Sequence, residues 1–157
     1  MATTKLMTAD DLLDMGEDAK FCELIIGELV CMSPASGKHS QITGVIFGHL
    51  WTFARDDPSH TVFESSAGYI LGRDPDVVLS PDVSVVRSDR FPAEGPGATF
   101  MELVPDLVVE VISPSERPGQ ITTKLLTYLN AGVQVVWYVD PENKSVTIHA
   151  ANEPPRT

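Results

Sequence analysis

The sequence has little positive charge: 11 Lys and Arg residues stand against 22 Asp and Glu residues, which gives a net charge of −11 at pH 7. Non-specific affinity for nucleic acids comes mainly from Lys and Arg side chains that neutralise phosphates, so this balance opposes wrapping around a polyanion. The opposition is partial. Carboxylates that bind divalent cations count as negative until the metal arrives, and a local basic strip or a dimer can supply phosphate contacts.

Long apolar runs and cysteines are also scarce. No apolar run approaches the roughly 18 residues of a membrane span. The first residues, MATTKLMTADDLLDMG, lack the pattern of a secretory signal, so we expect a cytoplasmic protein. Two thiols alone, Cys22 and Cys31, make neither a zinc site nor a disulfide framework. If they lie on neighbouring strands, we expect both to be reduced core residues.

The remaining composition is that of one globular domain. A chain of 157 residues with 43% hydrophobic and 21% charged residues can build a single core without metal or disulfide staples. We therefore expect one domain over residues 1–157, with its core at about residues 7–149. The tail from residue 152, NEPPRT, is expected to fray.

The first third of the chain predicts a helix, a hairpin and a longer helix. The short helix lies within residues 7–15 and is opened by Thr8. Two β-favouring runs on either side of Gly27 predict the hairpin. The longer helix should pack on a sheet through an apolar stripe. The stripe consists of Ile42, Val45, Ile46, Leu50 and Phe53.

The rest of the chain predicts strands around one more helix, and hence an α/β fold. Three β segments, TVFESSAGYIL, VVLSPDVSVV and DLVVEVIS, are followed by the helix QITTKLLTYLNAGV and the strands VQVVWYVD and SVTIHA. The irregular residues 88–105 are typical of either a mobile connector or a substrate-contacting lid. We predict a mixed sheet flanked by helices, in which the last helix connects two parallel strands.

Two carboxylates interrupt apolar strand patterns. Period-two alternation puts Glu110 on the same face as Val108, and Asp82 on the same face as Ser84. A lone buried carboxylate is unfavourable unless a cation, a positive side chain or water compensates it. Either acid alone is typical of a strand-end cap or a salt bridge. The pair, on neighbouring strands, favours a site for a hard cation such as Mg²⁺ that positions water and stabilises a phosphoryl group.

A series of short motifs carries a resemblance to a known family. In order, they are ELIIGELVCMSP from Glu23, His39 at the start of the long helix, Pro81-Asp82-Val83 followed by SVV, PDLVVEVISPS with Glu110, Lys124 followed by Tyr128, and AGVQVVWYVDP. Over about residues 7–149, their order and spacing resemble the Uma2 or DUF820 group of restriction endonucleases, which belong to the PD-(D/E)XK nuclease superfamily.

The resemblance implies a restriction-endonuclease-like mixed β-sheet flanked by helices, with an N-terminal helix and β-hairpin. It further implies a homodimeric, Mg²⁺-dependent endonuclease that hydrolyses phosphodiester bonds in nucleic acid, with DNA as the expected substrate and Mn²⁺ as a substitute metal. Asp82 and Glu110 would bind the metal, and Glu23 matches an early acidic position that would add a carboxylate. His39 also matches, but a histidine beside a helix start is more often a packing or hydrogen-bonding residue, so we leave it outside the site.

One position departs from the superfamily pattern, which puts a lysine two residues after the acid. Ile112 occupies that position, and the family resemblance implies Lys124, on the next helix, as the replacement. The buried stripe of this helix would consist of Ile121, Leu125 and Tyr128. Lys124 lies about 40° beyond the Tyr128 edge of that stripe, so we expect its stem on the core and its ammonium past the sheet margin.

Two functions therefore compete. The first is a metal-dependent endonuclease in which Asp82 and Glu110 bind Mg²⁺ and Lys124 stabilises the phosphate or water. The second is a non-catalytic interaction module with a nuclease fold, favoured by the acidic charge and by Ile112. Convergence of Asp82, Glu110 and Lys124 around a solvent-reachable pocket would favour the enzyme.

Overall fold

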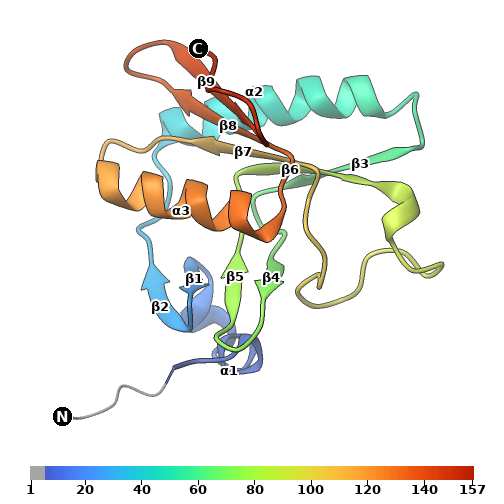
Figure 1. Cartoon of the computed structure of the whole chain (residues 1–157), viewed down its shortest axis with the longest axis vertical. Coiled ribbons are helices and arrows are strands. Elements are labelled where there is room, and N and C mark those ends of the chain that lie inside the picture. Colours follow the sequence, from blue (N-terminus) through green and yellow to red (C-terminus); the bar gives the residue numbers. More distant parts are fainter. Residues whose placement is uncertain (1–5) are drawn as a thin grey trace.

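The computed structural model describes residues 6–157 and places helices against two β-sheets (Figure 1). Helices α1, α2 and α3 span Ala9–Asp14, Gly37–Ala54 and Pro118–Ala131, and the short 3-10 helices η1 and η2 span Gly16–Ala19 and Ser88–Arg90. The strands are β1 Cys22–Ile25, β2 Glu28–Cys31, β3 His60–Glu64, β4 Tyr69–Gly72, β5 Val77–Leu79, β6 Val83–Arg87, β7 Leu107–Val111, β8 Val135–Asp140 and β9 Ser145–Ala150.

The two sheets differ in size and direction. The four-stranded sheet has the order β2-β1-β5-β4 and is antiparallel. The five-stranded sheet has the order β3-β6-β7-β8-β9, and β7 and β8 are its parallel pair. Helix α3 connects these two strands, which confirms the predicted parallel connection. Figure 1 shows α3 in front of the five-stranded sheet, α2 behind it, and the four-stranded sheet below.

Two of the predicted β segments are each divided between the two sheets. TVFESSAGYIL becomes β3 and β4, and VVLSPDVSVV becomes β5 and β6, so the predicted mixed sheet is the five-stranded one and a second, antiparallel sheet accompanies it. The first break includes Gly68, where an added Cβ would lie 2.7 Å from Cε1 of Phe100. The second break includes Pro81, which cannot donate a ladder hydrogen bond. These breaks let the chain cross from one sheet to the other.

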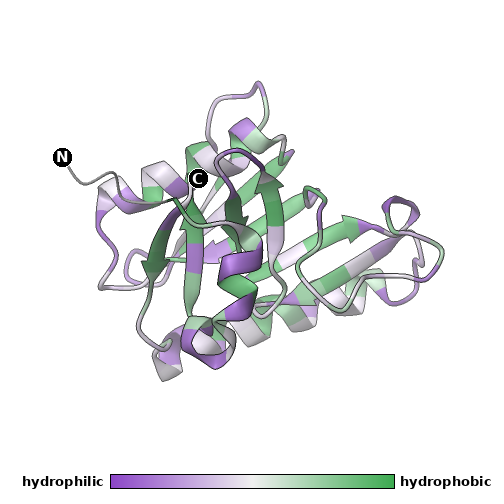
Figure 2. Ribbon diagram, turned by 90° about the horizontal axis from the view of Figure 1, so that it is seen from below, coloured by the Kyte–Doolittle hydropathy of each residue, from purple (hydrophilic) through white to green (hydrophobic). Residues whose placement is uncertain are grey.

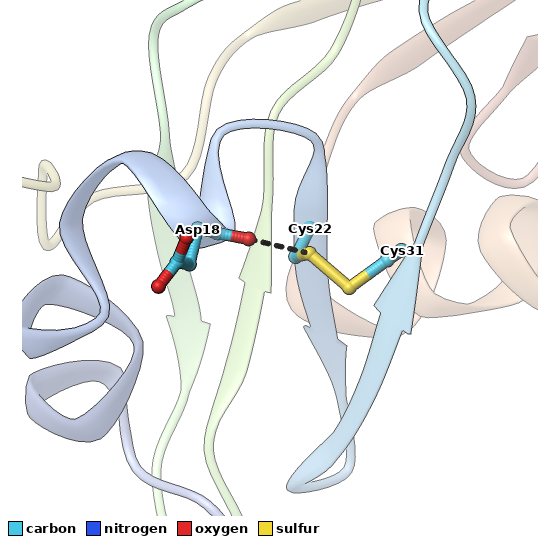
Figure 3. The surroundings of a disulfide bond; sticks show 3 residues. All are labelled: Asp18, Cys22 and Cys31. Carbon is cyan, nitrogen blue, oxygen red and sulfur yellow. Dashed lines mark hydrogen bonds between the residues drawn. A yellow bond between two sulfur atoms is a disulfide. The ribbon is translucent and has the colours of Figure 1, made fainter.

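Strands β1 and β2 form the predicted hairpin, with a disulfide that the sequence analysis did not expect. Ile26 and Gly27 have φ angles of 56° and 74°, as a type I′ turn requires. This turn sets Cys22 opposite Cys31, and the two are disulfide-bonded (Figure 3). Sγ of Cys22 also lies 3.9 Å from the carbonyl oxygen of Asp18. The prediction of two reduced core cysteines was wrong, because the register brings the pair together and Cys31 is exposed.

The hydrophobic core has one cluster under α1 and a larger one that joins Leu79 of the four-stranded sheet to residues of the five-stranded sheet. Hydrophobic segments run along the strands of both sheets (Figure 2). Helix α1 begins with a capping box between Thr8 and Asp11 and packs on the four-stranded sheet. The buried residues of this cluster are Ala9, Leu12, Leu24 and Val78. The larger cluster lies under α3. Its buried residues are Leu79, Val108, Tyr128, Val133, Val136 and Tyr138.

Helix α2 buries only part of the stripe that its sequence predicts, since Ile42, Ile46 and Leu50 are partly buried. It begins after the N-cap Ser36, whose side chain accepts a hydrogen bond from the His39 N–H, and its one buried residue is Ala54. Val45 is 55% and Phe53 76% exposed. The helix packs mainly against β3, the edge strand of its sheet, so most of its surface faces solvent. Within residues 6–157, no helix is both long and apolar enough to cross a membrane.

Two segments expected to be irregular are tied to the sheets. The tail was predicted to fray, but the backbone N–H of Ile148 donates to the carbonyl oxygen of Arg156 (2.7 Å), and the N–H of Arg156 donates back (3.0 Å). The loop over residues 88–105 begins with η2 and is anchored at Met101. The N–H of Met101 donates to Gly68, and its carbonyl accepts from Ile70, both at 2.9 Å.

Candidate active site

Glu110 lies on β7, on the face that packs against α3. Its Oε1 accepts a hydrogen bond from the Tyr128 hydroxyl at 2.6 Å and lies 2.9 Å from Nζ of Lys124. Lys124 and Tyr128 are four residues apart on α3, so both project from the same helix face. Glu110 is only 7% exposed, and the ammonium and hydroxyl compensate its burial.

Glu23 reaches the same ammonium from the four-stranded sheet. Its Oε1 lies 3.1 Å from Nζ of Lys124 and accepts a hydrogen bond from the Ser80 N–H at 2.7 Å. The ammonium therefore bridges carboxylates from both sheets. Lys124 is 9% exposed, so the prediction that its ammonium extends past the sheet margin was wrong. The hairpin carrying Glu23 covers that margin.

Asp82 lies immediately before β6 and is held beside β7. Its Oδ2 accepts a hydrogen bond from the N–H of Val111 at 2.7 Å, and it lies 3.2 Å from Nε2 of His39 on α2. Val111 follows Glu110 in the chain, so this bond joins Asp82 to the cluster around Lys124. Asp82 also borders a cavity of about 240 Å³, which it shares with His39, Thr43, Phe47 and Glu64, among others.

Burial and charge together set the protonation of these groups. Burial, helped by the charges of Asp82 and Glu23, outweighs the opposing effect of Lys124 and raises the pKa of Glu110 to about 8. Burial disfavours the ammonium of Lys124, but Glu110 and Glu23 outweigh that effect and raise its pKa above the ordinary value. The hydrogen bond with Asp82 raises the pKa of His39 above 6.5. A charged lysine therefore lies against a carboxyl group whose affinity for a proton is raised by burial.

The structure brings three of the four residues expected in the site into direct contact: Glu23, Glu110 and Lys124. Asp82 lies next to them through Val111 and is the member that borders a cavity. Sequence reasoning missed two contributors. Tyr128 was assigned to the apolar stripe, although its spacing from Lys124 signals a shared face. His39 was left outside the site, although its match to the family motif was the available signal.

The donor set suits a hard cation at two carboxylates. Mg²⁺ is commonly held by one or two carboxylates together with water and substrate phosphate, and Asp82 and Glu110 offer oxygen ligands of this kind. The contacts of Glu23 engage its Oε1 with Lys124 and Ser80. Among residues 6–157, no group of three or more His, Cys, Asp and Glu side chains is arranged to hold a metal ion. By the chemistry of the donor set alone, Asp82 and Glu110 would be the residues to hold such a cation.

Comparisons with known proteins identify the family and the fold of this chain. The model of the Uma2 family, described as putative restriction endonuclease, matches residues 9–157. The chain belongs to the Uma2 family. Its fold is similar to a crystal structure described as a putative nuclease belonging to DUF820 from Anabaena variabilis, with a TM-score of 0.82 and 23% sequence identity over 96% of this chain and 83% of that one. No curated protein matches the chain. The predicted family and α/β fold class are confirmed.

In this Uma2 chain, the position two residues after the strand acid is used for packing. Ile112 is partly buried against the large core cluster under α3. The ammonium that contacts Glu110 comes instead from Lys124, on the helix that follows. The helix that follows β7, and not β7 itself, thus supplies the cation that contacts this carboxylate.

Proposed function

We propose that this Uma2 protein is a metal-dependent endonuclease that hydrolyses phosphodiester bonds in DNA, with Mg²⁺ or Mn²⁺ bound by Asp82 and Glu110. The observation that carries the proposal is the contact of Lys124 with Glu110 at 2.9 Å. Asp82 accepts a hydrogen bond from Val111, the residue after Glu110 on β7. When bound, the metal ion would polarise the phosphate and activate a water molecule.

The protein's own groups would position the phosphate and hold the site together. The ammonium of Lys124 would stabilise charge on the phosphate oxygens. Glu23 positions that ammonium from the opposite sheet, and we propose it as the additional carboxylate near the metal. Tyr128 donates to Glu110 and so fixes its orientation, and His39 does the same for Asp82.

A second function is a non-catalytic interaction module. Ile112 at the superfamily's lysine position and the net charge of −11 favour it. The convergence of Lys124, Glu110 and Glu23 favours the enzyme, whereas the burial of Glu110 and Lys124, neither of which lines the cavity that Asp82 borders, favours the module.

Cleavage of plasmid DNA in Mg²⁺ or Mn²⁺ tests the proposal. Asp82→Asn should reduce the cleavage rate at least about a hundredfold, because it removes a proposed metal ligand. Asp56→Asn, at an exposed position beyond the end of α2, is the matched control and should cleave at the parental rate. A parent that cleaves no nucleic acid with either metal would favour the interaction module.

Thermal melts test the metal site without relying on activity. Mn²⁺ and Mg²⁺ should raise the Tm of the parent, because a ligand that binds the native state stabilises it by mass action. Asp82→Asn and Glu110→Gln should lose this shift. Equal shifts in all three proteins, or no shift at millimolar metal in the parent, would contradict the assignment of Asp82 and Glu110.

We also propose that the protein is a homodimer whose interface includes the apolar surface of α2. Val45, Trp51 and Phe53 are 55%, 49% and 76% exposed there. Helix α2 contains no Asp or Glu, so two copies can approach along it with less repulsion than the overall charge of −11 would impose. Sedimentation velocity tests this proposal, and a monomer across the micromolar range would contradict it.

A further inference from the structure

A second, larger cavity adjoins the one beside Asp82. Its volume is about 470 Å³, within the range of roughly 300–1,000 Å³ that is usual for small-molecule sites. Phe47 and Glu64 line both cavities, so the two lie side by side. Glu64 pairs with Val83, the residue after Asp82, which places the shared rim directly beside the proposed metal ligand.

The larger cavity has aromatic walls and little charge. Phe47, Phe63 and Phe100 line it, and Glu64 is the one ionisable side chain among its described lining residues. The wall at Phe100 is built around a glycine: a Cβ on Gly68 would lie 2.7 Å from Cε1 of that ring. The ring can lie against the backbone only because residue 68 has no side chain.

The rim carries a carboxylate held in place by hydroxyl groups. The Ser65 hydroxyl donates to Oε2 of Glu64 at 3.3 Å, and the Ser66 hydroxyl donates to Oε1. An ionised carboxylate only accepts hydrogen bonds. It therefore suits a ligand that presents an amino group, and it opposes one that presents a phosphate.

We propose that this cavity binds one unstacked nucleobase of a single-stranded DNA substrate, with Glu64 accepting a hydrogen bond from the base's amino group. The inference rests on the proposed nuclease function, and it names the substrate class. Neither cavity has a Lys or Arg among its described lining residues, so phosphate contacts there cannot supply the affinity. Stacking on aromatic rings can, since it contributes about 1–3 kcal/mol per base.

Single-stranded DNA offers its bases without the cost of unpairing, whereas a duplex must first release one. An acidic protein gains little from the dense phosphates of a duplex. The cavity therefore favours single-stranded or locally unpaired DNA over fully paired DNA.

Binding of a short fluorescein-labelled single strand, followed by anisotropy in EDTA, tests the inference. The parent should bind the single strand about tenfold or more tightly than the duplex of the same sequence. Phe47→Leu keeps an apolar side chain but removes the ring, and it should weaken single-strand binding roughly 5- to 100-fold. Phe21→Leu is the matched control at an exposed phenylalanine outside both cavities, and it should bind like the parent.

A second variant, Glu64→Ala, keeps the inference testable if Phe47→Leu fails to fold. The parent should bind oligo(dC) more tightly than oligo(dT), because cytosine has an amino group and thymine has none. Glu64→Ala, at an exposed position, should remove that preference. Parental affinity in Phe47→Leu, equal binding of duplex and single strand, or no binding of either by the parent would overturn the inference.

Parallel cleavage assays separate this inference from the proposed function. A parent that binds single strands through Phe47 but never cleaves them supports the cavity assignment and contradicts the nuclease. If the parent cleaves DNA and Phe47→Leu binds and cleaves DNA equally well, the cavity assignment is overturned and the nuclease proposal stands.

Discussion

Helices α2 and α3 lie on opposite faces of the five-stranded sheet, and they bury opposite kinds of residue. Helix α2 leaves Val45, Trp51 and Phe53 largely exposed. Helix α3 buries a lysine and a tyrosine, Lys124 and Tyr128, and leaves the large apolar Leu126 52% exposed. Hydropathy alone would assign these burials the other way round.

The difference shows that neighbouring groups, and not hydropathy alone, decide what these helices bury. Lys124 is buried because Glu110 and Glu23 lie within 3.1 Å of its ammonium. The exposed side chains of α2 lie on a helix that rests on an edge strand, and Trp51 has only the exposed Arg55 against its ring, 5.9 Å from the ring centre, among the described aromatic contacts. On α3 a lysine with partners is thus buried among apolar residues, whereas on α2 large apolar side chains stay exposed.

Replacing Lys124 by Met should have the largest effect. It leaves Glu110 and Glu23 buried without their cation, and removal of one partner from a buried ion pair typically costs about 3–5 kcal/mol of unfolding free energy. Urea unfolding measures this loss. DNA cleavage should fall about a hundredfold or more if Lys124 stabilises the phosphate, while metal should still raise the Tm.

The matched control is Lys38→Met, an exposed lysine in the first turn of α2. Its unfolding free energy should stay within about 0.5 kcal/mol of the parent. If the Lys124 and Lys38 variants lose similar amounts, the contrast between the two helices has no energetic basis. Parental cleavage by Lys124→Met would remove this lysine from the chemistry.

The next largest effect is expected from raising the pH, because a buried polar side chain, Tyr69, also lies on β4. Tyr69 is fully buried, its hydroxyl lies 2.7 Å from Oγ of Ser84, and burial raises its pKa to about 12. Between pH 10 and 12 the unfolded chain binds fewer protons at this residue than the native protein, so stability should fall as pH rises. The loss is on the order of 2 kcal/mol.

Urea unfolding of the parent and Tyr69→Phe at several pH values measures this loss. Tyr69→Phe should be less stable than the parent below pH 10, because Ser84 loses a hydrogen-bond partner, and its stability should decline less steeply above pH 10. Parallel declines in the two proteins would contradict the assignment to Tyr69.

The smallest effect is expected on the exposed side of α2. Phe53→Ser should change the unfolding free energy of the monomer by no more than about 0.5 kcal/mol, because the side chain is already 76% exposed. Urea unfolding at low protein concentration measures this. A loss of several kcal/mol would mean that Phe53 packs within the monomer, and the two helices would then differ less than the exposures indicate.

Much of the local structure could be predicted from sequence, and the disulfide could have been. Alternation and turn residues predicted the hairpin at Gly27, and Gly132 predicted the end of α3, where its φ is 101°. Had the two-residue turn at Ile26 and Gly27 been extended outward, it would have placed Cys22 opposite Cys31. The division of strands between sheets could not be predicted, because alternation continues on both sides of the breaks and does not say which sheet each half joins.

The candidate site could be predicted only in part, because its contacts join distant elements. The patterns of β7 and of the segment around Asp82 marked two carboxylates, and the family motif marked Lys124 and Glu23. A helical wheel gives the direction of Lys124 relative to its own helix. It does not show that Glu23, from another sheet, covers that direction.

The path of the chain between the sheets bears on how the protein unfolds. The chain makes β1 and β2 in the four-stranded sheet, β3 in the five-stranded sheet, β4 and β5 back in the first, and then β6 in the second. Neither sheet is therefore one continuous segment that could be released as a fragment or melt alone. We expect cooperativity to extend across both sheets, so that loosening the hairpin at Glu23 also loosens β7, on the far side of the lysine that joins them.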